Sequence, residues 1–192
     1  MNYINNSILH NYMIDANYDV TGYIALDKKV NGIINKYIND FVYNLPPYSV
    51  EPNVIYYFNL NNEKYEYKKY LSYVYKIEEY TGGAHPSHYI FTVIYDKKNN
   101  KIISIIDFIK YDKMLLKKLS KLSRVELINN YDFDLPDDNL KSIFYDGTEG
   151  ILKNYKNILP TESGLLIIFE RYQIAPYYMG EFSIILPYDK LK

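Results

Sequence analysis

The sequence predicts an α+β fold in which a largely antiparallel sheet is packed by two main helices. Two long segments repeat apolar residues at helical spacing, whereas the residues between and after them alternate with a period of two. Turn residues join the alternating segments as hairpins rather than as the crossovers of a parallel sheet. Each helix has a one-sided apolar stripe, so each needs a sheet face to cover it.

The first helix is expected at about residues 24–43, after a strand-and-turn region over residues 1–22. Polar Asn31, Asn35 and Asn39 fall on the side opposite its apolar face, and the prolines after Leu45 end it, because proline cannot continue a helix. The apolar face is spaced at three, four and seven residues, and it comprises Leu26, Val30, Ile33, Ile34, Tyr37, Ile38 and Phe41.

Strands are expected next, because the apolar residues then alternate with polar ones. Residues 54–60 form the first of them, and Asn61-Asn62 is expected as a turn before a second, long strand over residues 65–80. A hairpin follows, in which residues 90–95 and 101–106 flank a polar turn at residues 96–100.

The second helix is expected at about residues 112–128, where Leu115, Leu116, Leu119 and Leu122 form an apolar stripe. Residues 130–150 are acidic and rich in turn residues, so they are expected to connect rather than to form an element. A short strand, a turn at Gly164 and two final strands at residues 165–172 and 181–186 complete the chain.

The domain organisation expected is an N-terminal module at residues 1–95 and a C-terminal module at residues 96–192, joined in one globular unit. The chain has 192 residues, of which 48% are hydrophobic, so it can bury a sizeable core. No repeat or low-complexity linker divides it.

Composition excludes several classes of function. The net charge of -1 removes the electrostatic motive for binding nucleic acid or an anionic membrane. The absence of cysteine excludes a disulfide scaffold, a thiolate zinc site and a cysteine nucleophile. The first residues do not have the pattern of a signal peptide, and no apolar run is long enough to span a membrane.

Tyrosine is unusually frequent, with 25 residues in the chain. A surface rich in tyrosine can stack on sugars or anchor a protein partner. The same abundance, together with many Ile, Asn and Lys residues, is also expected from an AT-rich genome. Composition alone therefore does not locate a site.

Two segments stand out as motifs: TGGAHP at residues 81–86 and GLLIIFERYQIAPYYMGEFSIILPYDKL at residues 164–191. In the first, Gly82 or Gly83 is expected at positive φ and His85 is expected to bond backbone carbonyls. In the second, Tyr172, Tyr177 and Tyr178 surround Pro176 at a chain reversal, where they either close the core or anchor a ligand.

These segments, in this order and at this distance, resemble the extracytoplasmic domains of the lysozyme-sensing anti-sigma-V factor RsiV and of peptidoglycan deacetylases such as PdaC. Those proteins carry the domain of unknown function 3298 with an N-terminal companion module. The resemblance covers about residues 20–191, and Tyr178 departs from it where the family often has a small residue. The residues that match it are Tyr73 to Tyr80, Thr81 to Pro86, Tyr95-Asp96, Lys101 to Phe108, Gly164-Leu165, Phe169, Tyr172, Ile174 to Tyr177, Gly180 and Leu186 to Leu191.

The resemblance implies a non-enzymatic, extracytoplasmic binding or sensor domain for a lysozyme-like protein or a cell-wall glycan such as peptidoglycan. The alternative is an accessory module of a cell-wall-modifying enzyme. The candidate ligand-binding residues are Gly82, Gly83, His85, Tyr172, Tyr177 and Tyr178. Neither a cofactor nor a catalytic constellation is expected, because no nucleophile motif, phosphate loop or facing carboxylate pair occurs.

Two motifs have some features of a metal site, but neither is expected to bind metal. His85 and His88 are three residues apart, but the glycines and Pro86 around them disfavour the helix that would bring them together. The aspartates of residues 132–138 suggest calcium, yet an EF-hand frame would place Asp137 where glycine is required. This segment is predicted to be a solvated acidic loop.

Overall fold

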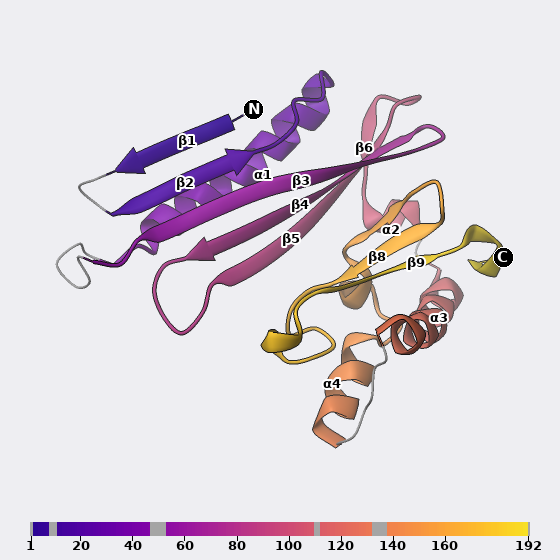
Figure 1. Ribbon diagram of the computed structural model, residues 1–192. Helices are drawn as coiled ribbons and strands as arrows, with labels where there is room; N and C mark the ends of the chain where they lie inside the picture. The colour runs from indigo at the N-terminus through magenta and orange to yellow at the C-terminus, as the bar shows by residue number, and fades with distance from the viewer. Residues whose placement is uncertain (1, 8–10, 47–52, 110–111, 132–137, 192) are drawn as a thin grey trace. The chain divides into compact units, whose positions relative to one another are not determined.

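The computed structural model describes residues 2–7, 11–46, 53–109, 112–131 and 138–191, which group into two units (Figure 1). Unit 1 comprises residues 1–64, 73–91 and 100–102, and unit 2 comprises residues 65–72, 92–99 and 103–192. The division expected from the sequence at residue 95 stays a prediction.

A six-stranded sheet in the order β1-β2-β3-β4-β5-β6 begins in unit 1, and its long strands β3 to β5 contribute residues to both units. β1 and β2 are antiparallel, whereas β2 and β3 are parallel because helix α1 forms the connection between them. The elements are β1 (Asn2–Ser7), β2 (Tyr12–Asn17), α1 (Ile24–Tyr43), β3 (Tyr56–Tyr67), β4 (Tyr70–Tyr80), β5 (Ser87–Asp96) and β6 (Lys101–Ile103).

Helix α1 covers one face of the sheet in unit 1, as its apolar stripe predicts. Leu26, Val30 and Ile34 are buried along it. Near its carboxyl end the ring of Phe41 lies edge-on to Tyr12, with centroids 6.1 Å apart, and 5.8 Å from the ring of Phe58. Aromatic pairs in this geometry contribute beyond their buried area.

Unit 2 contains a second, three-stranded antiparallel sheet in the order β7-β8-β9. All five residues of β8 are buried, and helix α3 packs against β9, where the Tyr131 hydroxyl donates to the Ser183 carbonyl at 2.7 Å. The elements are α2 (Ile105–Phe108), α3 (Lys113–Tyr131), α4 (Asp138–Gly147), η1 (Leu152–Tyr155), β7 (Ile158–Pro160), β8 (Leu165–Phe169), η2 (Tyr177–Met179), β9 (Phe182–Leu186) and η3 (Tyr188–Leu191).

The α+β class, the mainly antiparallel pairing and the two main helices are therefore confirmed. The expected turn at Asn61-Asn62 is wrong, because β3 runs through both residues. The Asn62 side chain accepts a hydrogen bond from the Asp19 backbone N–H at 2.9 Å, which holds it in the strand. The turn lies instead at Lys68, whose φ is 53°.

Three further expectations need correction. Residues 138–147 of the expected connection form helix α4, while residues 132–137, which hold most of the acidic loop, lie outside the described residues. The strand expected to reach residue 106 ends at Ile103, since Ser104 caps helix α2 by accepting from the Asp107 N–H at 3.1 Å. β8 ends at Phe169 rather than at residue 172.

The turn between β5 and β6 is organised by the carboxylate of Asp96 in unit 2. It accepts from the Lys69 ammonium at 2.6 Å, from the Asn99 side chain at 2.7 Å and from the Lys98 and Asn99 backbone N–H groups at 3.0 Å. The Lys69 ammonium, with help from Asn99, lowers the pKa of Asp96 to about 2 although burial opposes this. The charged carboxylate therefore stabilises the turn.

We expect Ile34→Asp to destabilise the protein by several kcal/mol, roughly 3–5, because Ile34 is 1% exposed and the new charge would be buried without a partner. Asn35→Asp at the next, exposed position is the control and should change stability by no more than about 0.5 kcal/mol. Urea denaturation measures both. Equal midpoints for the two variants would show that α1 does not cover the sheet.

The Asp96 turn predicts a specific dependence of stability on pH. A carboxyl whose folded pKa is depressed contributes stability above its unfolded pKa of about 3.9, and this contribution is lost as pH falls toward the folded value. Thermal midpoints should therefore fall between about pH 4 and pH 2, and Asp96→Asn should lower the midpoint at pH 7 and flatten that decline. Asp15→Asn, at an exposed position, is the control and should retain the wild-type dependence of the thermal midpoint on pH. The same dependence in Asp96→Asn would show that Asp96 does not stabilise the turn.

Candidate functional site

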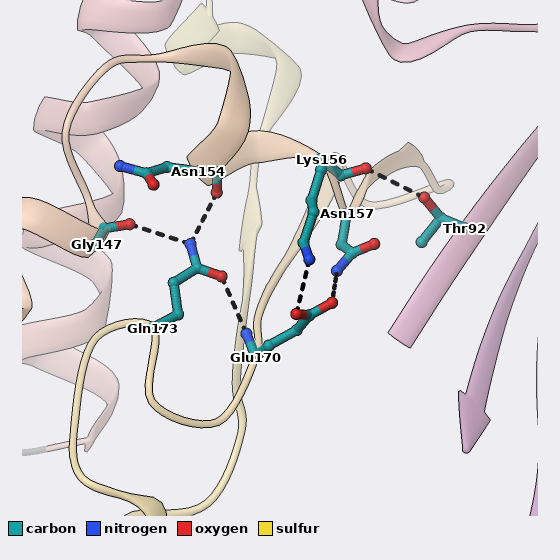
Figure 2. A network of polar contacts seen from close by, with 7 residues as sticks. All are labelled: Thr92, Gly147, Asn154, Lys156, Asn157, Glu170 and Gln173. Carbon is teal, nitrogen blue, oxygen red and sulfur yellow. Dashed lines mark hydrogen bonds and ion pairs between the residues drawn. The ribbon is translucent and has the colours of Figure 1, made fainter. Parts of the chain in front are cut away.

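The candidate site in unit 2 is the chain reversal after β8, over residues 170–180, which contains the YQIAPYYMG part of the sequence motif. The reversal is held against the carboxyl end of helix α4 by the polar network drawn in Figure 2. Its residues come from β5, α4, η1, the segment before β7 and the reversal itself.

Helix α4 ends at buried Gly147, and its last four carbonyls have no partner within the helix. All four accept hydrogen bonds from side chains elsewhere in unit 2. The donors are Thr148 Oγ1 to the Phe144 carbonyl at 2.7 Å, Arg124 Nη2 to Tyr145 at 3.0 Å, Asn154 Nδ2 to Asp146 at 2.7 Å and Gln173 Nε2 to Gly147 at 3.1 Å.

Gln173 is the residue that ties the reversal to the rest of unit 2. Its side-chain amide donates to the carbonyls of Gly147 and Asn154, at 3.1 and 2.9 Å, while its side-chain oxygen accepts from the Glu170 backbone N–H at 3.1 Å. A Cβ on Gly147 would lie 1.8 Å from the Gln173 carbonyl oxygen, so only glycine permits this approach.

Glu170 fixes the other side of the reversal. Its carboxylate accepts from the Lys156 ammonium and from the Asn157 side-chain amide, both at 2.8 Å. Beside these residues lies a surface cleft of about 400 Å³ that is also lined by Lys153 and Arg171. The cleft therefore offers cationic donors and a carboxylate to any molecule that enters it.

The tyrosine surface, which comprises Tyr172, Tyr177 and Tyr178, lies on this fixed base. Tyr172 is 61% exposed and Tyr178 is 83% exposed. The Tyr172 and Tyr177 rings lie 5.5 Å apart, and the Arg171 guanidinium sits 4.7 Å above the Tyr177 ring and donates to the Tyr177 carbonyl at 3.2 Å. The structure thus brings the Tyr172 and Tyr177 rings together, and exposed Tyr178 follows Tyr177 directly in the chain.

Tyr172 has a φ of 65°, a conformation that is strained for a bulky residue. It directly precedes Gln173, whose bonds to Gly147 and Asn154 hold the backbone there. Strained backbone of this kind persists where the surrounding structure determines it, and it occurs often at binding sites. The conformation turns the large Tyr172 ring outward, where it remains mostly exposed.

The TGGAHP loop belongs to unit 1 and connects β4 to β5. Gly82 and Gly83 have φ values of 105° and 104°, which confirms the expected positive φ. The Tyr80 hydroxyl donates to the Gly83 carbonyl at 3.0 Å, and His85 Nδ1 lies 3.0 Å from the Pro86 carbonyl, as expected for a histidine that bonds the backbone. A binding role for these residues stays a prediction.

Carboxylates and histidines are dispersed in the described part of the chain. His88 Nδ1 lies 3.7 Å from a Glu78 oxygen, and Glu78 also accepts from the Tyr57 hydroxyl at 2.8 Å. Burial raises the pKa of Glu79, whose carboxylate accepts from the Tyr89 hydroxyl at 3.1 Å. Among described residues no group of three His, Cys, Asp or Glu side chains could hold a metal ion, and no helix has the length and apolar character to cross a membrane.

Sequence reasoning missed the residues that build the site around the tyrosines: Glu170, Gln173, Asn154 and Lys156. Glu170 and Gln173 flank Arg171-Tyr172 inside the motif itself, so their position was a usable signal. Asn154 and Lys156 lie more than a dozen residues earlier, and only the folded chain shows that they face the reversal.

Comparison with known proteins links the chain to one family. The model of the family described as "Protein of unknown function (DUF3298)" matches residues 97–189. The chain is also similar to the peptidoglycan-N-acetylmuramic acid deacetylase PdaC of Bacillus subtilis (strain 168), with 33% identity over 125 residues. That match covers 65% of this chain and 26% of PdaC, so it spans about a quarter of the relative's length.

Two solved structures share the fold. A DUF3298 family protein from Pseudomonas aeruginosa PAO1 matches with a TM-score of 0.73 and 15% identity, covering 100% of this chain and 89% of that one. A DUF3298 family member from Bacteroides fragilis NCTC 9343 matches with a TM-score of 0.58 and 21% identity, covering 93% of this chain and 81% of that one. At these identities the similarity concerns the fold alone.

We expect Gly147→Ala to destabilise the protein by more than about 2 kcal/mol, because the added methyl would meet backbone atoms that cannot move aside. Gly32→Ala in α1 is the matched control: nothing lies within 4 Å of its Cβ position, and the change should stabilise by up to about 1 kcal/mol. Thermal denaturation compares them. Similar midpoints would contradict a tight contact between α4 and the reversal.

Proposed function

Residues 97–189 belong to the DUF3298 family, and from this membership and the site geometry we propose that the chain is a non-enzymatic, extracytoplasmic binding domain for cell-wall glycan. The observation that carries the proposal is the exposure of Tyr172 and Tyr178 on a reversal whose backbone is fixed by Gln173 and Glu170. A preorganised aromatic surface binds at low cost in conformational entropy.

The chemistry of the tyrosine surface suits a sugar. The C–H face of a pyranose ring packs on an aromatic ring, while the phenol hydroxyl remains available for hydrogen bonds. The adjacent cleft of about 400 Å³ adds the ammonium groups of Lys153 and Lys156 and the carboxylate of Glu170, which can bond hydroxyl and acetamido groups. Together they combine an apolar platform with a few placed polar groups, as ligand sites do.

The relationship to PdaC supports the glycan as the ligand. That relative is named for deacetylating N-acetylmuramic acid in peptidoglycan, and this chain matches 26% of it. A segment of such a protein that holds the polymer would serve the enzyme without performing its reaction. The chain could therefore act as an accessory module of a cell-wall-modifying enzyme, and the same surface would carry that role.

A lysozyme-like protein is the second candidate ligand, and one observation favours it. Tyr178, with 83% of its surface exposed, is accessible as an anchor that could enter a partner's cleft. The resemblance of the sequence motifs to the lysozyme-sensing factor RsiV points in the same direction. Glycan and protein would then compete for one surface.

Calorimetric titration with soluble peptidoglycan fragments and with a lysozyme tests the proposal. We expect saturable binding of at least one ligand, and the double variant Tyr172→Ala/Tyr178→Ala should weaken it at least ten-fold, since exposed aromatic anchors contribute about 1 kcal/mol or more each. Tyr43→Ala, in α1 and 88% exposed, is the control and should bind normally.

Two results of the titrations would refute the proposal. One is the absence of binding by either ligand at hundreds of micromolar, which corresponds to about -5 kcal/mol. The other is wild-type affinity in the Tyr172→Ala/Tyr178→Ala protein with an unchanged circular-dichroism spectrum. Turnover of a wall substrate by the chain alone would contradict the non-enzymatic role.

A further inference from the structure

The exposed side of helix α1 in unit 1 carries a groove that the proposed function does not use. The groove has a volume of about 700 Å³, within the range of small-ligand sites. Its lining residues recur three and four positions apart, so they share one side of the helix. We call this feature the α1 groove; it is lined by Lys28, Lys29, Gly32, Ile33, Lys36 and Tyr37 among others.

The α1 groove is cationic. Lys28, Lys29 and Lys36 are exposed, and the ion pairs of the described residues include none of them. The one acidic residue among the described lining residues is Asp40. Lys28 and Lys36 are about 12 Å apart along the helix axis, given a rise of about 1.5 Å per residue. The groove can therefore bind two anionic groups separated by about that distance.

Gly32 gives a second, independent indication of an occupant. A glycine in the interior of a helix costs about 1 kcal/mol relative to alanine. Its φ is not in the left-handed region, and no atom lies within 4 Å of the position that a Cβ would take. Neither packing nor backbone geometry in the described structure requires glycine here, but its absent side chain keeps the floor of the α1 groove open.

The apolar wall of the α1 groove is rigid. The Tyr37 ring stacks on Phe91 with centroids 6.0 Å apart and an interplanar angle of 12°, and it lies 5.4 Å from Tyr89. Ile33, one turn earlier, is half-buried beside it. A ligand would thus meet aliphatic and aromatic carbon on one side and ammonium groups on the other.

We propose that the α1 groove binds a short peptide that carries free carboxylates and small apolar side chains. This inference rests on the proposed function, by which the peptide is the stem of peptidoglycan. The alanine methyl groups of the stem match the apolar wall, and its carboxylates match the lysines. The three lysines favour an anionic ligand over an uncharged sugar, since Asp40 is the one carboxylate among the described residues lining the groove. The tyrosine surface and the α1 groove would then recognise different parts of one polymer.

Titration of the full chain with the N-acetylated stem pentapeptide, and with the same peptide after amidation of its carboxylates, tests this inference. The acidic peptide should bind, with an affinity that falls as salt is added, and the amidated peptide should bind at least ten-fold more weakly. Lys28→Gln/Lys36→Gln should also lose at least ten-fold in affinity for the acidic peptide.

Gly32→Leu separates a blocked groove from a damaged fold. It should raise the thermal midpoint by a few degrees, because leucine is the better helix former, yet weaken peptide binding at least ten-fold by filling the groove. Asn35→Leu, at an exposed α1 position outside the lining residues, is the matched control and should bind the peptide normally.

The inference is wrong if the acidic peptide does not bind, if the amidated peptide binds with the same affinity, or if Gly32→Leu binds the acidic peptide as tightly as the wild-type protein does. A peptide-free glycan strand provides the separation from the proposed function: its binding should survive Gly32→Leu and be lost in Tyr172→Ala/Tyr178→Ala. If the strand binds and the pentapeptide does not, only the α1 groove is refuted. If the strand depends on Gly32 instead, the groove takes sugar and the peptide inference is wrong.

Discussion

The close approach of helix α4 to the reversal after β8 is the constraint on which the candidate site in unit 2 depends. The last four carbonyls of α4 need partners, and side chains of Thr148, α3, η1 and the reversal supply them. Gln173 can reach Gly147 only because residue 147 has no side chain. The same contact holds the backbone that carries Tyr172, so the bond that ends the helix also positions the tyrosine surface.

The tyrosine surface and the α1 groove derive their rigidity from different sources. The tyrosine surface lies on irregular backbone, which is fixed by hydrogen bonds from Gln173 and Glu170. The α1 groove lies on a regular helix, which is held by the burial of Leu26, Val30 and Ile34. Hydrogen-bonded loops can present large side chains in unusual directions, whereas a helix presents charges at fixed spacing. This difference matches an aromatic platform in one case and a row of lysines in the other.

Turn chemistry shows how far local signals reach. The turn after β5 was predictable, because the Asp96 carboxylate accepts from Lys98 and Asn99, two and three residues later, and only its bond from Lys69 comes from a distant part of the chain. Asn61-Asn62 has the same turn-forming residue type but lies inside β3, where the Asp19 backbone, distant in sequence, binds Asn62. A local preference was overridden by a tertiary hydrogen bond that no window of sequence contains.

The sequence by itself determined the α+β class, helices α1 and α3, the hairpin around Asp96 and the positive φ of Gly82 and Gly83, because periodicity and glycine conformation are local properties. It also indicated the tyrosines of the reversal. Only the tertiary structure decided that α4 is a helix, that β8 stops at Phe169 and that Gln173, Asn154 and Glu170 support the tyrosine surface. These features depend on pairing carbonyls and carboxylates with donors far away in the chain, and such partners are selected by packing rather than by their neighbours in sequence.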